Sequence, residues 1–257
     1  MIASMMHSAD SLGLTSLAQR RIELKYTVDA RLASEVQQWA REHLEADEHC
    51  SPQSLDSYEV STLYFDSPAL DIYHRTPQSD ISKRRIRRYG AESTLWLEVK
   101  SKKQNVVKKR RSAIAAEQLQ PLAVATQESR LKSDGEEWDW FAQLLIEKQL
   151  QPMVLVHYRR FARAKCADGE SLRLTIDTQM QASTCREWNV HHRGASPAYD
   201  LGDTQILELK FNNNMPFLFK QLLQAFPILS ANFSKYRTAV GKCEIASAPL
   251  LGRNTDA

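Results

Sequence analysis

Charged side chains recur at every second position in several short segments of this sequence. The segment RIELKYTV (21–28) alternates Arg21, Glu23 and Lys25 with apolar residues. Successive side chains of a β-strand point to opposite faces, so these three residues would share one face. The same spacing recurs in Arg85 and Arg87; Glu98 and Lys100; Lys109 and Arg111; Arg173, Thr175 and Asp177; and Glu208 and Lys210. Guanidinium and ammonium groups gathered on one face can bind oxyanions, and arginine suits phosphate in particular.

Carboxylates share these positions with the basic residues. Glu23 and Glu208 each precede a lysine by two residues, in the tripeptide E-L-K. A carboxylate beside a phosphate chain repels it unless a divalent cation lies between them. Magnesium and manganese commonly bind through one or two carboxylates plus substrate phosphate oxygens. The pattern therefore predicts a site for a complex of a metal ion with a polyphosphate.

Strands must position most of these residues. Alternation predicts strands over residues 21–28, 58–66, 82–90, 94–102, 106–114, 152–163, 171–180 and 204–211. Helical periodicity appears over 33–44, after a start at Asp29, over 138–150, and after Pro216. The segments between them are polar and rich in turn residues. The chain is therefore predicted to form a single α+β domain with many antiparallel strands.

The charged face of these strands has two interpretations. Each strand by itself fits an ordinary antiparallel sheet with one solvated face. If the sheet instead closes into a barrel, alternate side chains point into its lumen. A dry lumen with about ten cations would repel itself, because uncompensated buried charge costs several kcal/mol per ion. Such a lumen must hold water and anions.

Bulk properties exclude few functions. The formal net charge is +3, but the segment from Lys83 to Arg111 holds twelve Lys or Arg against two acidic residues. Four cysteines without C-x-x-C spacing fit a reducing compartment. No apolar run approaches the roughly 20 residues of a membrane span, and the first residues do not resemble a signal peptide. We therefore expect a cytoplasmic location.

Nine short motifs occur in a recognisable order: RIELKY, LYFD, RIRRYG, LEVK, KRR, Y-x-R-x-A, R-x-T-x-D, LELK and SKY. From about Arg21 to Lys242 the chain resembles the VTC domain, the polyphosphate polymerase branch of the CYTH-like triphosphate tunnel metalloenzymes. The resemblance implies an antiparallel, closed barrel of about eight strands, the triphosphate tunnel, with helices packed outside. We expect this domain to span 21–245, between flexible extensions at 1–20 and 246–257.

The resemblance also implies an activity, transfer of the terminal phosphate of a nucleoside triphosphate such as ATP onto a polyphosphate chain with Mn²⁺ or Mg²⁺. The implied phosphate-binding residues are Lys25, Arg85, Arg87, Lys100, Arg160, Arg173, Lys210 and Lys235. Within KKRR, the alternation along the strand indicates that Lys109 and Arg111 lie on the charged face. If the strand is shifted by one residue, Lys108 and Arg110 take their place. The implied metal ligands are Glu208 first, Glu23 second, and Glu98 as a further candidate.

One position departs from the related triphosphatases and cyclases, which begin with E-x-E-x-K. Arg21 stands at the place of their first glutamate. Loss of that carboxylate removes a ligand for a second, water-activating metal and favours transfer over hydrolysis. Two alternatives stay open: a triphosphatase of the same fold, and a non-catalytic module that binds polyphosphate or another polyanion.

The expected partners are a nucleoside triphosphate and polyphosphate, without nucleic acid. The chain is expected to be a monomer that does not insert into a membrane, so any coupling to membrane transport would require a membrane-protein partner. Tyr64 and Asp66 of LYFD fit a core tyrosine and a turn aspartate at least as well as a site. His191 and His192 lie in a polar segment and are expected to be exposed.

Overall fold

The strands of the protein follow the alternating segments closely. The computed structural model describes residues 21–50, 56–77, 82–103, 106–129, 136–167, 170–191 and 198–245. Eight strands have seven or more residues: β1 (Arg21–Val28), β3 (Ser57–Asp66), β4 (Lys83–Tyr89), β5 (Thr94–Lys103), β6 (Val106–Ala115), β7 (Gln151–Ala167), β8 (Glu170–Thr184) and β10 (Gln205–Asn212). Three have two residues: β2 (Glu45–Ala46), β9 (Tyr199–Asp200) and β11 (Leu229–Ser230).

All of these strands belong to one antiparallel sheet. Ten follow the order β2-β7-β3-β4-β5-β6-β1-β10-β8-β9; β11 pairs with β1, and β7 pairs additionally with β8. The prediction of a closed barrel of eight strands is wrong, because the sheet has 11 strands and does not close. The break lies between β6 and β1, which pair at a single position, Ile22 opposite Val106. The remainder of β6 pairs only with β5.

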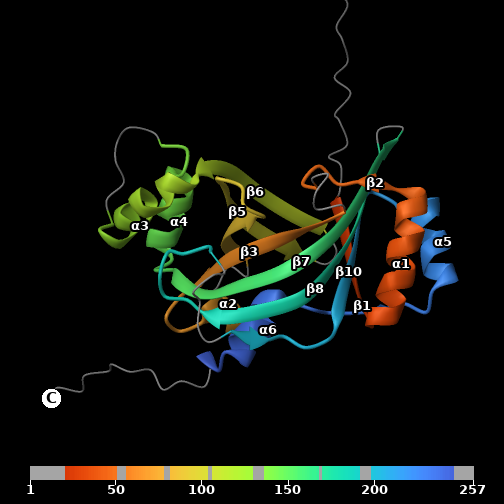
Figure 1. Ribbon diagram of the computed structural model, residues 1–257. Coiled ribbons are helices and arrows are strands. Elements are labelled where there is room, and N and C mark those ends of the chain that lie inside the picture. The colour runs from red at the N-terminus through yellow and green to blue at the C-terminus, as the bar shows by residue number, and fades with distance from the viewer. Residues whose placement is uncertain are drawn as a thin grey trace, which may run out of the picture.

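The sheet is nevertheless strongly curved. Figure 1 shows β5 and β6 lying behind β3 and β7, so that the strands surround a concave face. Alternation in the sequence places each side chain on one face of its strand, but it carries no information on whether β6 and β1 pair along their length.

Helices cover the convex face at the two ends of the sheet. At one end, α1 (Ala30–His43) and α5 (Phe217–Ala225) lie side by side (Figure 1). At the other end lie α3 (Leu119–Gln127) and α4 (Asp139–Glu147) (Figure 1). The short elements are α2 (Asp71–His74), the 3-10 helix η1 (Ala116–Gln118) and α6 (Lys235–Lys242). The start predicted at Asp29 is confirmed, since its side chain accepts a hydrogen bond from Leu32 N at 2.8 Å.

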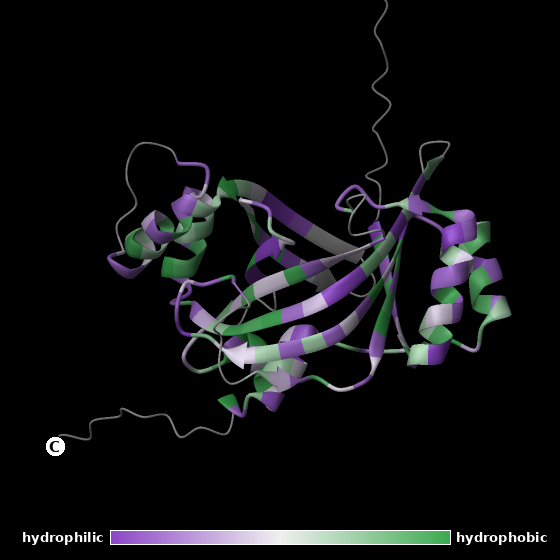
Figure 2. Cartoon of the chain, viewed as in Figure 1, coloured by the Kyte–Doolittle hydropathy of each residue, from purple (hydrophilic) through white to green (hydrophobic). Residues whose placement is uncertain are grey.

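The apolar core lies between these helices and the convex face. Leu207, Leu209 and Leu174 are fully buried and belong to one cluster with Val36 and Ala40 of α1. Burial of each such leucine contributes about 1.5–3 kcal/mol relative to exposure. Figure 2 shows the resulting alternation of hydrophilic and hydrophobic residues along β7 and β8. Because the apolar set is fixed under the helices, the charged set must lie on the concave face.

The predicted extensions at 1–20 and 246–257 lie outside the described residues. Among the helices that the structure describes, none has both the length and the apolar character to cross a membrane.

Candidate functional site

The concave face contains a cavity of about 670 Å³. Its lining is dominated by charge, with ten basic and two acidic residues among the described ones. The basic residues are Lys25, Arg75, Lys83, Arg85, Arg87, Lys100, Arg160, Lys210, Lys235 and Arg237, and the acidic residues are Glu23 and Glu208. Such an excess of positive charge around a cavity suits a ligand that carries several negative charges.

Strands β1 and β10 place the two E-L-K tripeptides against each other. Their antiparallel register sets Glu23 opposite Lys210 and Lys25 opposite Glu208. Both glutamates are about 5% exposed. The two carboxylates therefore share one wall of the cavity, each flanked by a lysine from its own strand and one from the neighbouring strand.

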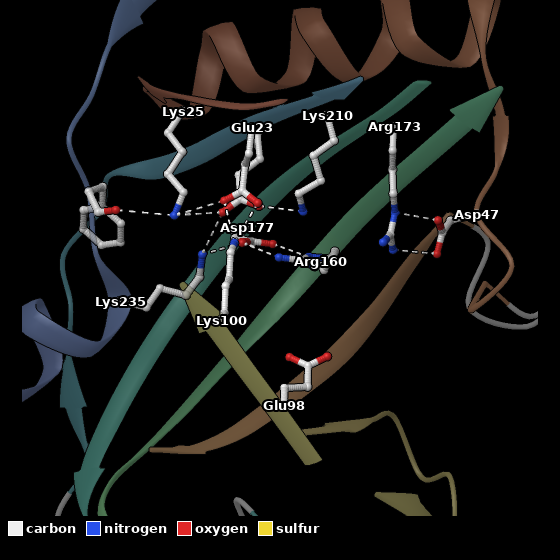
Figure 3. A network of polar contacts seen from close by, with 12 residues as sticks. Glu23, Lys25, Asp47, Glu98, Lys100, Arg160, Arg173, Asp177, Lys210 and Lys235 are labelled. Atoms are coloured by element: carbon white, nitrogen blue, oxygen red, sulfur yellow. Dashed lines mark hydrogen bonds and ion pairs between the residues drawn. The ribbon is translucent and has the colours of Figure 1, made fainter. Parts of the chain in front are cut away.

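Lysine ammonium groups neutralise this pair of carboxylates (Figure 3). Lys100 Nζ donates to both oxygens of Glu23, at 2.9 and 2.7 Å. Lys25 Nζ lies 3.7 Å from Glu23 and 3.2 Å from Glu208, and Lys210 Nζ lies 2.8 Å from Glu208. Burial and the nearby Glu208 would raise the pKa of Glu23, but the three lysines lower it to about 2. Burial opposes ionisation of Glu208 as well, but Lys210, Lys25 and Lys235 hold its pKa well below the usual value, so both glutamates are ionised.

Asp177 on β8 supports two of the cations. Its oxygens accept hydrogen bonds from Arg160 at 2.6 and 2.8 Å and from Lys235 at 2.5 Å. Burial opposes ionisation, yet Arg160 and Lys235 lower the pKa of Asp177 to about 2. Because Asp177 is fully buried, it fixes both side chains against the wall while leaving them at the cavity.

The opposite wall presents arginines from β4. Arg85 and Arg87 are 8% and 6% exposed and line the cavity. Arg85 Nε donates to Glu98 at 2.7 Å, and Arg87 Nε donates to Thr62 Oγ1 at 3.2 Å. Burial would raise the pKa of Glu98, but Arg85, Arg87 and Lys109 hold it well below its usual value. This wall therefore offers fixed guanidinium groups.

Nine of the thirteen residues predicted for the site line this cavity: Glu23, Lys25, Arg85, Arg87, Lys100, Arg160, Glu208, Lys210 and Lys235. The other four, Glu98, Lys109, Arg111 and Arg173, do not. Lys109 Nζ is 2.5 Å from Glu98 and Arg111 Nε is 3.6 Å from it. Arg110 instead stacks 4.0 Å over the Trp140 ring. The Lys108 side chain lies outside the described part of the chain.

Sequence reasoning missed three basic residues of the lining, Lys83, Arg75 and Arg237. Lys83 could have been found, because it has the same parity as Arg85 and Arg87 in the segment KRRIRR. Arg75 directly follows α2 and Arg237 belongs to α6, where alternation gives no signal. Burial, followed by repulsion from Lys25, Lys100 and Arg85, lowers the pKa of Lys83 well below its usual value.

The glutamate pair also fits a divalent cation. The described residues contain no group of three or more His, Cys, Asp or Glu side chains that could hold a metal ion without other ligands. Glu23 and Glu208, however, are close enough for the Lys25 ammonium to contact both. One or two carboxylates are the usual protein contribution to Mg²⁺, which takes further ligands from water and substrate phosphate. Glu98 fits less well, since Arg85 and Lys109 already engage its carboxylate.

Comparison with known proteins identifies a family. The VTC domain matches residues 20–243, which is most of the chain. The structure resembles that of HpAC1 from Hippeastrum, for which a dominant triphosphatase activity is reported, with a TM-score of 0.51 and 16% identity over 91% of this chain and 99% of that one. A Bacillus halodurans protein described as a candidate adenylate cyclase has a TM-score of 0.49 and 15% identity, over 84% and 94% of the two chains. At this identity the Hippeastrum likeness indicates a shared fold only. No curated protein matches the sequence.

Proposed function

Because this chain belongs to the VTC domain family, we propose that it transfers the terminal phosphate of a nucleoside triphosphate, ATP, onto a polyphosphate chain. The observation that carries the proposal is the cavity lining, in which ten basic residues face two glutamates. This lining supports an anion with many phosphates rather than a nucleobase. Phosphoryl transfer needs in-line positioning and neutralisation of charge, and both can come from fixed cations.

The chain's own residues divide this work between arginines and lysines. Arg85, Arg87 and Arg160 are buried and fixed by hydrogen bonds, so they orient phosphate oxygens without losing much side-chain entropy. The lysines of the lining supply point charges that can follow a moving phosphate. The acceptor is a phosphate oxygen that is already anionic, so the reaction requires no general base.

A divalent cation, Mn²⁺ or Mg²⁺, completes the proposed site. Glu23 and Glu208 would hold it, and it would neutralise charge on the phosphate being transferred. In its absence the lysines that contact these carboxylates keep the buried charges paired.

Transfer is favoured over hydrolysis by the residue at position 21. Arg21 is exposed and lies opposite Asn212, at the end of β1 next to Glu23. The wall therefore has no third carboxylate on β1 to bind a second, water-activating metal.

One observation favours a triphosphatase as the second candidate. Arg173, predicted for the phosphate path, does not line the cavity, so the path is short.

We further propose that the protein acts in the cytoplasm as a monomer on a nucleoside triphosphate and polyphosphate, without binding nucleic acid. Coupling to a membrane, if the cell uses it, would come from a membrane-protein partner.

The test is incubation of the purified protein with ATP and Mn²⁺, followed by separate assays for long-chain polyphosphate and free phosphate. The proposal predicts polyphosphate as the main product. Release of free phosphate without polymer would select the triphosphatase. Metal-independent binding of polyphosphate with neither product would select a binding module.

A further inference from the structure

A short segment crosses the concave face at the end away from Lys83 and Lys235. It follows β2, which pairs with Arg163 and Ala164 of β7, and it comprises residues 47–50. On the concave face, Asp47 contacts Arg173 of β8 and Tyr58 of β3. His49 stacks on Tyr89 of β4, with ring centroids 4.1 Å apart. The segment, which we call the 47–50 strap, therefore contacts β8, β3 and β4. It covers the part of the concave face that lies beyond the cavity.

Arg173 would be the next cation along the phosphate path if the strap were absent. It lies opposite Lys210, which lines the cavity, on the adjacent strand. It also has the parity of Thr175 and Asp177, so its side chain leaves β8 on the concave side. Arg173 is nevertheless missing from the cavity lining. The reason is its engagement by the strap.

Asp47 holds Arg173 as a phosphate would. The Arg173 Nε lies 2.8 Å from one carboxylate oxygen, and Nη2 donates to the other at 3.0 Å. Tyr58 reinforces the contact, because its hydroxyl donates to Asp47 at 3.2 Å and accepts from Arg173 Nη2 at 2.9 Å. Asp47 is 5% exposed, and Figure 3 shows its carboxylate facing the Arg173 guanidinium. The Asp47 carboxylate thus accepts one hydrogen bond, from Nη2, and lies against the Nε and Nη2 edge of the guanidinium, where a phosphate can make bidentate contacts with arginine.

We propose that Asp47 sets the length of phosphate chain that the site accepts, by occupying the Arg173 guanidinium until a long chain displaces it. The proposal rests on the proposed function, since it assumes that polyphosphate binds in the cavity. A short chain fills the cavity without reaching Arg173 and leaves the Asp47 contact intact. A longer chain exchanges one oxyanion partner of Arg173 for another, and Asp47 then turns to water.

The exchange is thermodynamically reasonable because the guanidinium stays paired throughout. An unpaired buried charge would be costly, whereas replacement of a carboxylate by a phosphate keeps a negative charge beside the guanidinium and an acceptor for the Nη2 hydrogen bond. Only a chain long enough to reach Arg173 has to break the contact between Asp47 and Arg173. The cost of breaking it therefore makes the binding free energy of long chains alone less favourable. Asp47 therefore lowers affinity for long chains and leaves affinity for tripolyphosphate unchanged.

The experiment compares the dissociation constants of tripolyphosphate and long-chain polyphosphate in wild type and Asp47→Asn. The near-isosteric asparagine keeps a polar contact and removes the charge. We expect long-chain affinity to rise by about 10-fold, the scale of a hydrogen bond to a charged group, with tripolyphosphate affinity unchanged. The exposed Asp203→Asn provides a control with the same change in net charge and should raise neither selectively.

Two further variants test whether Asp47 affects the binding of long chains through its contact with Arg173. Tyr58→Phe loosens Asp47 without altering charge and should shift selectivity in the same direction by a smaller factor. Asp47→Asn combined with Arg173→Met should abolish the gain. Equal effects of Asp47→Asn on both ligands, or a gain that survives Arg173→Met, would overturn the proposal. Failure of the wild type to bind tripolyphosphate would instead overturn the proposed function.

Discussion

The ammonium group of Lys100 lies on both carboxylate oxygens of Glu23, at 2.9 and 2.7 Å. It thus occupies the oxygens that we propose for the metal ion. The neighbouring Glu208 is engaged in the same way by Lys25 and Lys210. Metal binding must release these lysines, and released lysines are free to bind phosphate. We therefore expect metal and phosphate to raise each other's affinity, since such coupling is reciprocal.

The first prediction concerns this competition. Lys100→Met should raise the affinity of the ligand-free protein for Mn²⁺ by about 10-fold, because an ammonium no longer competes for Glu23. The same variant should weaken the effect of tripolyphosphate on Mn²⁺ affinity. Electron paramagnetic resonance of free Mn²⁺ measures both. Lys83→Met is the matched control, since Lys83 lines the cavity but donates to Ser234 Oγ rather than to a glutamate. Equal gains in both variants would contradict a specific role of Lys100.

The second prediction concerns the protons that the protein takes up when it binds a phosphate chain. Burial and repulsion from neighbouring cations hold the pKa of Lys83 well below its usual 10.5. A bound phosphate chain supplies negative charge and raises that pKa again, so the protein should take up protons on binding at a pH between the two pKa values of Lys83. Calorimetry of tripolyphosphate binding in buffers of different ionisation enthalpy measures the uptake. Lys83→Met should reduce it, and a binding heat that is independent of the buffer would contradict the assignment.

The third prediction concerns Asp177 and stability. Asp177→Asn leaves Arg160 and Lys235 without their buried partner and should lower the free energy of unfolding by about 3–5 kcal/mol at neutral pH. The folded-state pKa of Asp177, about 2, lies below the usual 3.8. Its contribution is therefore complete above pH 3.8 and is lost as the pH falls towards 2.

Urea unfolding of wild type and Asp177→Asn at several pH values tests whether the contribution of Asp177 to stability is lost on acidification. The difference in free energy should shrink as the solution is acidified through that range. A difference that stays constant down to the lowest pH would mean that the ionised carboxylate is not what stabilises the fold.

Much of the site could be predicted because alternation fixes the face of each side chain. The apolar residues of β1, β8 and β10 had to be buried under helices, which placed Glu23, Lys25, Glu208 and Lys210 together on the other face. Lys83 obeys the same rule and was overlooked within a segment that is basic on both faces.

The remainder depends on contacts between residues far apart in the sequence. Closure of the sheet was expected, but β6 and β1 meet at one residue pair, and alternation cannot report that gap. Asp47 and Arg173 are 126 residues apart, and nothing near either residue signals their contact. Asp66, expected to be a turn residue, is fully buried and accepts hydrogen bonds from Ile72 N, Tyr73 N and the Tyr236 hydroxyl. It thereby joins α2 and α6; Arg75 directly follows α2, Lys235 begins α6, and both line the cavity.

The most direct test of the proposed site is the rate of polyphosphate formation from ATP and Mn²⁺ in Glu208→Gln. Mutation of a residue that only supports a metal ligand costs about 10- to 100-fold, so loss of a ligand itself should cost more. We predict loss of both polyphosphate and free phosphate as products at a temperature at which the variant is still folded, since removal of a buried carboxylate beside Lys25 and Lys210 also lowers stability. The control Glu35→Gln, on the exposed face of α1, should keep full activity. An undiminished rate in Glu208→Gln would contradict the assignment of the metal site.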